Sequence, residues 1–215
     1  MHPVEMDPKP AKYAPEASDV IALVTNHPFA WAVSAPGADA VPWSATPLPL
    51  RPRFDADGRL VAFVGHFARA NAQVERLRAR PNALLLFMGH HGYVSPSWLS
   101  DRTQAATWNY QSAAFDCRLQ LIDDAAGIEE ALRDLIGGME QGRDKAWSLD
   151  EMGERAARLA RGVVAFRADI LSSQAAFKLG QDERDSEYAE ILAGLEGDGQ
   201  ADLAAAMRGQ NPGRS

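Results

Sequence analysis

Residues 65–110 read GHFARANAQVERLRARPNALLLFMGHHGYVSPSWLSDRTQAATWNY, and this stretch contains both helix-like and strand-like patterns. The stretch joins a segment of helical spacing, 68–80, to a continuous apolar run, 83–88, and ends where a long alternating run begins. It also holds three of the five histidines and two of the five tryptophans, close to Gly65, Gly89 and Gly92. Glycine relaxes the backbone near polar groups, so this composition indicates a ligand site.

Strand patterns dominate the chain on both sides of this stretch. The runs predicted as strands are 29–34, 60–64, 83–88, 107–122 and 162–171. Residues 41–53 carry four prolines, which predicts an edge strand or an irregular extended segment, because proline cannot donate a ladder hydrogen bond. Helices are predicted over 19–26, 68–80, 128–139, 151–159 and 184–207. Strands and helices do not alternate regularly, so we expect a mainly β fold with flanking helices (α+β), a small antiparallel barrel and not a doubly wound sheet.

The chain is predicted to fall into three parts. Residues 1–17 contain four prolines and no apolar run, which is typical of an extended arm. Residues 18–183 form the barrel domain, with 92–98 as a second extended piece and 172–181 as a loop containing one short extended piece. Residues 184–215 form a C-terminal helix, interrupted at Gly194, Gly197 and Gly199, with 209–215 as a frayed tail.

Composition sets limits on the class of protein. With 215 residues, 46% hydrophobic and 24% charged, the chain can bury a real core. The formal net charge of −7 argues against a broad electrostatic contact with DNA, although a local basic patch remains open. The single cysteine, Cys117, excludes an intrachain disulfide and is expected in the core. The sequence shows no signal peptide and no membrane-spanning run, so we expect a soluble, cytoplasmic protein.

Several kinds of catalytic site lack support in the sequence. His66, His90 and His91 have no cysteine or carboxylate nearby at a recognised metal-ligand spacing. Ser95 and Ser97 lack the glycine turn that exposes a nucleophilic serine. The glycines between positions 89 and 92 fit neither a phosphate-binding loop of the Walker type nor a dinucleotide fingerprint.

An anion site is better supported. His66 and Arg69 stand where a strand enters a helix, and free N–H groups there together with a guanidinium favour a phosphate. Asn71 adds a side chain that both donates and accepts. The alternative is that Arg69 is a surface arginine and Asn71 a helix cap.

Aromatic residues follow that motif. Trp98, Trp108 and Tyr110 offer flat faces, and Asn109 can bind a ring edge; core packing is the alternative for each aromatic. Lys178 and Gln181, in the run FKLGQ, could project to one side of an extended segment. The alternative for them is a solvent-facing loop.

Four motifs in order, GHFARAN, GYVSPSW, TWNY and FKLGQ, resemble those of the PaiB family of FMN-binding negative transcriptional regulators. The resemblance runs from about Pro28 to Gln181. It implies a flavin-binding split β-barrel related to pyridoxamine-phosphate oxidase, and a homodimer with FMN at the subunit interface. Departures from the family pattern are Leu99, Ala105, Ala106, Gly180 and Asp182.

The resemblance also implies roles for the motif residues. Arg69, with His66 and Lys178, would neutralise the FMN phosphate. Asn71, Trp108, Asn109 and Gln181 would hold the ribityl chain or the edge of the isoalloxazine ring, with Trp108 or Tyr110 packed on the ring. Two functions stay open: transcriptional regulation, or a flavin-dependent oxidoreductase or flavin reductase that uses the same FMN.

Overall fold

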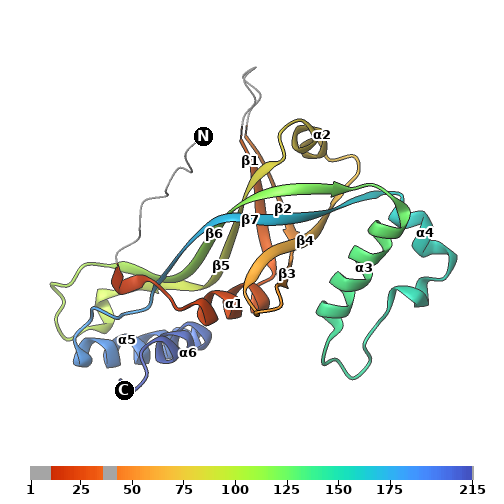
Figure 1. Ribbon diagram of the computed structural model, residues 1–215. Coiled ribbons are helices and arrows are strands. Elements are labelled where there is room, and N and C mark those ends of the chain that lie inside the picture. Colours follow the sequence, from red (N-terminus) through yellow and green to blue (C-terminus); the bar gives the residue numbers. More distant parts are fainter. Residues whose placement is uncertain (1–10, 36–42, 215) are drawn as a thin grey trace. The chain divides into compact units, whose positions relative to one another are not determined.

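A seven-stranded sheet carries the part of the chain that the structure describes, residues 11–35 and 43–214 of a computed structural model (Figure 1). The strands lie in the order β2-β1-β5-β6-β7-β4-β3. β1 pairs antiparallel with β2 and β5, and β4 pairs antiparallel with β3 and β7. The mainly antiparallel β fold with flanking helices is confirmed. The strands are β1 (Phe29–Ser34), β2 (Ser44–Pro49), β3 (Arg51–Phe54), β4 (Leu60–Ala68), β5 (Asn82–Val94), β6 (Thr107–Ile122) and β7 (Val163–Lys178).

Proline-bearing strands form the two edges of this sheet. β2 contains Pro47 and Pro49 and pairs with β1, whereas β3 contains Pro52 and pairs with β4. Proline has no N–H to donate, so it is tolerated in a strand that has a neighbour on one side only. The prediction of an edge strand or extended segment is confirmed from Ser44 to Arg53, while residues 36–42 lie outside the described residues.

Contacts divide the described chain into two units, which we call the terminal and the central unit. The terminal unit comprises 11–23, Met88–Ala113 and 174–214; the central unit comprises Val24–Phe87 and Ala114–Ser173. Strands β5, β6 and β7 run through both. In the described ranges, no helix is long and apolar enough to cross a membrane. The α-helices are α1 (Ala17–Asn26), α2 (Ala72–Ala79), α3 (Ala125–Glu140), α4 (Glu154–Ala160), α5 (Asp185–Gly197) and α6 (Ala201–Gln210).

Phenylalanine rings fill the core of the central unit. Phe63 on β4 lies 5.0 Å from Phe87 on β5 and 4.9 Å from Phe115 on β6, measured between ring centroids. Phe67 and Phe166 form a second pair at 5.0 Å between β4 and β7. All five side chains are buried, and each burial stabilises the fold by about 1.5–3 kcal/mol. Ring contacts therefore connect β4 to β5, β6 and β7.

Helix α3 packs on the same unit. It begins after Asp124, whose side chain accepts a 2.8 Å hydrogen bond from the Gly127 N–H, one of the helix's otherwise unpaired donors. Its inner face buries Ile128 against Val64 of β4 and Ala165 of β7. The cap and the apolar face together fix where this helix lies on the sheet.

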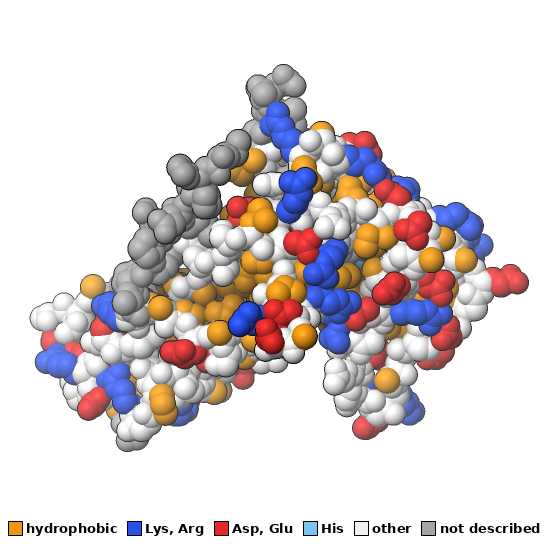
Figure 2. Space-filling model, viewed as in Figure 1, with side chains coloured by type: hydrophobic (Ala, Val, Ile, Leu, Met, Phe, Trp, Pro, Cys, Tyr) orange, Lys and Arg blue, Asp and Glu red, His pale blue; other side chains and the backbone are white. Residues whose placement is uncertain are grey.

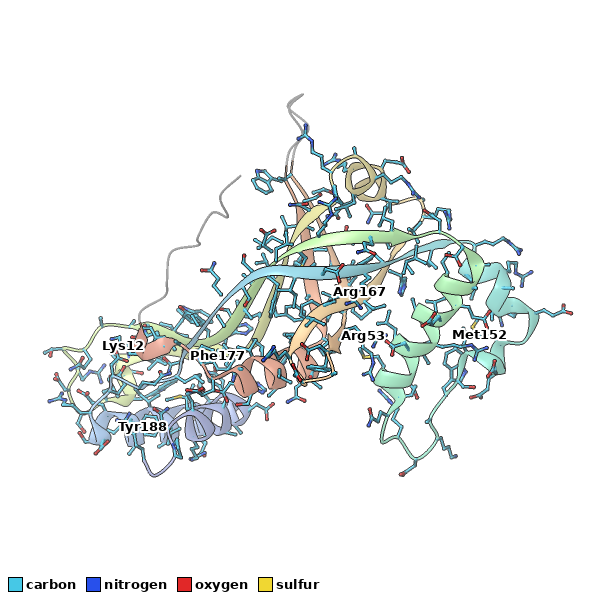
Figure 3. All side chains as sticks on the ribbon, viewed as in Figure 1. Lys12, Arg53, Met152, Arg167, Phe177 and Tyr188 are labelled. Atoms are coloured by element: carbon cyan, nitrogen blue, oxygen red, sulfur yellow. The ribbon has the colours of Figure 1, made fainter. Side chains whose placement is uncertain are left out.

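Helices α5 and α6 cover the terminal unit and lie side by side (Figure 1). Phe177 of β7 and Tyr188 of α5 are both buried there (Figure 3). Gly92 of β5 lets α6 approach closely, because a Cβ at this position would stand 2.8 Å from Leu203 Cδ2. The glycine therefore serves packing between strand and helix.

Three strands are longer than the sequence indicated. β4 continues to Ala68, which pairs with Val163 of β7, so α2 begins at Ala72 and the predicted helix start at 68 is wrong. β5 continues to Val94 without a separate second piece. β7 continues to Lys178, so the predicted loop from 172 is wrong up to that residue. Polar, half-exposed residues in the middle of β7 hid the strand pattern.

Glycines split two of the predicted helices. The interruption predicted at Gly199 is confirmed: its φ of +77° separates α5 from α6, although α5 runs through Gly194 to Gly197. Gly153, with φ of +52°, divides the predicted helix 151–159 into a 3-10 turn and α4. The frayed tail is wrong for its described part, because α6 reaches Gln210 and the buried Asn211 donates to the Leu179 carbonyl at 3.0 Å.

The adjacent histidines mark an irregularity in β5. Buried positions alternate up to Gly89, and the alternation then resumes one residue out of step at Gly92. The backbone N–H of His90 donates to the Gln111 side chain at 3.2 Å, and His91 Nδ1 donates to the Gly89 carbonyl at 2.9 Å. One extra residue at this point has the character of a β-bulge, which changes the face that the strand presents to the core.

A core glycine gives the first test of this packing. A Cβ on Gly65 would stand 2.7 Å from Phe166 Cζ and 2.8 Å from Leu50 Cδ2, and both of those side chains are fully buried. We expect Gly65→Ala to lower the free energy of unfolding by about 1–3 kcal/mol, measured by urea denaturation, because the core cannot move aside.

Gly137→Ala is the matched control. Gly137 lies within α3, and a Cβ added there would have no atom within 4 Å, so alanine should raise the free energy of unfolding by roughly 0.5–1 kcal/mol. Equal effects of the two substitutions would contradict the packing described for Gly65.

Candidate functional site

His66 lies on β4 of the central unit, opposite Ala165 of β7. The ring is half-buried, and its Nδ1 is buried without a hydrogen-bond partner among the described residues. Burial lowers the pKa of His66 below its ordinary value of 6.5, because the imidazolium would lose hydration. A neutral ring with an unused nitrogen is suited to a hydrogen bond with a ligand.

Arg69, two residues beyond Phe67, is held on three sides. Nε donates to the Arg161 carbonyl at 3.0 Å, Nη2 to the Val163 carbonyl at 2.8 Å, and Nη1 to Asp123 Oδ1 at 2.9 Å. These bonds tie the end of β4 to the start of β7. A guanidinium has five N–H groups, so two of them are left after these three bonds.

Asp123 is shared by two arginines. Arg78 of α2 donates to both of its oxygens, at 2.7 and 2.9 Å, in addition to Arg69. The hydrogen bonds from Arg78 above all, together with those from Arg69, hold the pKa of Asp123 below its usual range. Asp123 follows directly after the predicted strand 107–122, and nothing in the spacing of these residues in the sequence indicates that they meet.

Asn71 acts as the N-cap of α2. Its Oδ1 accepts from the Gln73 N–H at 2.9 Å, and its Nδ2 donates to Thr46 Oγ1 at 2.9 Å. Thr46 in turn donates to the side chain of Gln73, which is fully buried. The helix-cap interpretation of Asn71 is therefore what the structure shows, and Thr46 and Gln73 are polar partners that the sequence did not indicate.

The terminal unit holds the other motif residues. Trp108 of β6 is 54% exposed, with its ring 6.4 Å from His91 and nearly parallel to it, and 6.2 Å from Tyr93 at a steep angle. Tyr110 is half-buried. An exposed indole supported by two neighbouring rings offers a flat apolar surface to a planar ligand.

Three further motif residues bond within the terminal unit. Lys178 Nζ donates to Thr107 Oγ1. Asn109 is buried; its Nδ2 donates to Met207 Sδ at 3.3 Å, and its Oδ1 has no partner in the described chain. Gln181 closes a turn, accepting from the Leu179 N–H at 2.7 Å and donating to the Phe177 carbonyl.

Trp98 and the three glycines serve packing. A Cβ on Gly194 of α5 would lie 2.3 Å from the Trp98 ring, so this tryptophan packs against α5. Gly65, Gly89 and Gly92 each face a side chain at a distance too short for a Cβ, and none has a positive φ. Close packing, and not backbone freedom, explains them. In the described ranges, no three His, Cys, Asp or Glu side chains group so as to hold a metal ion.

Comparison with known proteins decides the family. A family model described as "Putative FMN-binding domain" matches residues 8–172. The chain belongs to this family, and FMN is its cofactor. The "Protease synthase and sporulation protein PAI 2" of Bacillus subtilis (strain 168) is 30% identical over 153 residues, which cover 71% of this chain and 72% of that protein. The resemblance to the PaiB family is confirmed.

Solved structures show the same fold. The flavocytochrome Anf3 from Azotobacter vinelandii has a TM-score of 0.57 at 18% identity, covering 75% of this chain and 67% of that one. The FAD and heme binding protein from Mycobacterium smegmatis has a TM-score of 0.56 at 17% identity, covering 85% and 80%. The predicted split β-barrel is confirmed.

The buried imidazole gives a test by pH. Because the pKa of His66 is lower in the folded chain than in the unfolded one, the unfolded chain binds the proton more readily. We expect the free energy of unfolding to fall as the pH drops from 6.5 towards the folded pKa, and this contribution to level off below it. His66→Gln should lack that part of the slope, and identical slopes for the two proteins, measured by urea denaturation across this range, would contradict the burial of His66.

Proposed function

We propose that this chain is a cytoplasmic, homodimeric regulator of the PaiB type, in which bound FMN sets the state of the protein. Two findings support the proposal: the chain belongs to the FMN-binding family, and its sequence is 30% identical to a PAI 2 protein. The observation that carries it is an apolar sheet face with nothing covering it in the described chain, as expected of one subunit of a dimer. We further propose that residues 18–183 act as the barrel domain and 184–215 as the C-terminal element. Of the predicted arm, residues 1–17, positions 1–10 lie outside the described residues.

Four residues are proposed to contact FMN directly. His66 has an unused ring nitrogen, and Lys178 carries a positive charge suited to the phosphate. Trp108 and Tyr110 offer ring faces for the isoalloxazine. The chemistry of each side chain thus suits one part of FMN, either its phosphate or its flat ring system.

The other four predicted site residues are proposed to act by holding the backbone. Arg69 hydrogen-bonds at the end of a strand, and Asn71 at the start of a helix. Asn109 makes a buried contact, and Gln181 closes a turn. When bound, FMN supplies electron-transfer chemistry, and the protein's part is to position it and control access.

The uncovered apolar face lies on β1 and β5. Trp31, 50% exposed, stands directly opposite Leu86, 36% exposed, and Phe29 two residues away is 65% exposed. Side chains two apart on a strand share a face, so these three form one patch. Large apolar side chains grouped on a surface mark an interaction site, and an isologous dimer would cover the patch with its own copy.

A charge placed in the patch tests the dimer. Trp31→Lys should convert a dimer into a monomer in sedimentation equilibrium, because each interface would bury two unpaired ammonium groups. Leu159→Lys, at an equally exposed leucine of α4 (55%), is the control and should leave the mass unchanged. A wild-type monomer, or a Trp31→Lys dimer, would contradict the proposal.

A flavin-dependent oxidoreductase or flavin reductase is the second candidate, favoured by the net charge of −7, which opposes contact with DNA phosphates. A gel shift of the chain's own upstream DNA that weakens as salt rises is expected for the regulator. Rapid bleaching of bound flavin by NADPH or NADH, without any gel shift, would instead establish the reductase.

A further inference from the structure

A cavity of about 720 Å³ lies in the central unit, between α3, α4 and two residues next to them, Asp123 after β6 and Arg161 before β7. Its volume falls in the range of small-molecule sites, roughly 300–1,000 Å³. Of the predicted site residues, only Arg69 lines it. Its apolar wall consists of Ala125, Ile128, Leu149, Ala156, Ala157 and Ala160.

The sequence of α4 explains the space. This helix reads ERAARLA, and it turns alanines towards α3 while its one leucine, Leu159, is exposed. Ile128 and Leu149 are buried at the wall, so the cavity has an apolar floor that is already fixed. The recess is therefore large enough to hold a small molecule in place of water.

Charged side chains form the rest of the lining. Asp123 accepts from Arg69, and Arg133 donates from Nε to Glu129 at 3.0 Å and from Nη2 to Asp150 at 2.5 Å. Every carboxylate of the lining thus has an arginine partner. Figure 2 shows acidic and basic side chains interspersed in the region of these helices.

Arg161 is the one arginine of this lining whose guanidinium has no carboxylate partner in the described chain. Its carbonyl accepts from Arg69, but its guanidinium makes no hydrogen bond or ion pair within residues 11–35 and 43–214. An exposed guanidinium beside an apolar wall can hold one anionic group through two parallel hydrogen bonds. Glu129 and Asp150 share one arginine, Arg133, so a negative charge remains on the lining and disfavours a doubly charged group such as the FMN phosphate.

We propose that this cavity binds a small organic monoanion, an aryl or acyl carboxylate or sulfonate, with its apolar body on the α4 alanines and its charge on Arg161. The site is separate from that of FMN and gives the protein a second ligand. A ligand there would contact both α3 and Arg69, which ties the end of β4 to β7.

The probe is 8-anilinonaphthalene-1-sulfonate, which has an aromatic body and one negative charge. Calorimetry on the FMN-saturated protein should show one site per chain. Arg161→Gln should weaken binding about tenfold, the loss expected for one charge-assisted contact. Ala157→Leu, which adds volume at the wall but keeps a good helix former, should abolish it.

Two controls separate the effect of Arg161 from a general loss of positive charge and from apolar binding alone. Arg158→Gln removes the same charge from α4 at a position outside the lining and should leave the affinity unchanged. The uncharged N-phenyl-1-naphthylamine should bind more weakly than the sulfonate and be indifferent to Arg161→Gln. Equal losses for the two arginine variants, displacement of the sulfonate by FMN, or no binding at all would overturn the proposal.

Discussion

The close approach of β4 to β7 is the constraint on which the central unit depends. Phe63 and Phe67 of β4 are packed among rings from β5, β6 and β7, and Gly65 between them has no side chain because the Phe166 ring occupies that space. This packing sets the register that brings His66 opposite Ala165 and places Arg69 within reach of the Val163 carbonyl. The packing of Phe67 in the core therefore fixes the position of Arg69, two residues further along the chain.

Local patterns predicted those parts of the fold whose cause is local. Strands Phe29–Ser34 and Thr107–Ile122 follow from alternation between turn signals, and their predicted and observed ends agree. The prolines of residues 41–53 predicted an edge strand or an irregular extended segment, because the missing N–H is a property of each proline alone; the structure has edge strands there. The motifs identified the family for the same reason: they are short and fixed in order, so the sequence alone displays them.

What the sequence did not show depends on residues that meet only after folding. Asp123 joins Arg69 across 54 positions, and Met207 covers Asn109 across 98. No spacing rule connects such pairs. The change of buried face at His90 and His91 was hidden because one extra residue alters the face of a strand without altering its composition. The family resemblance gave Asn71 a role at the flavin, while its hydrogen bonds show a cap that organises α2.

A fluorescence titration of FMN with the purified protein tests the central claim most directly. Stacking of the isoalloxazine ring on an aromatic side chain should quench flavin emission, and the quenching should saturate at one FMN per chain. Trp108→Leu should bind with less quenching, since the indole is more exposed than the neighbouring Tyr93 ring and offers a larger flat face. A colourless protein that leaves the emission of FMN unchanged at every concentration would contradict the account.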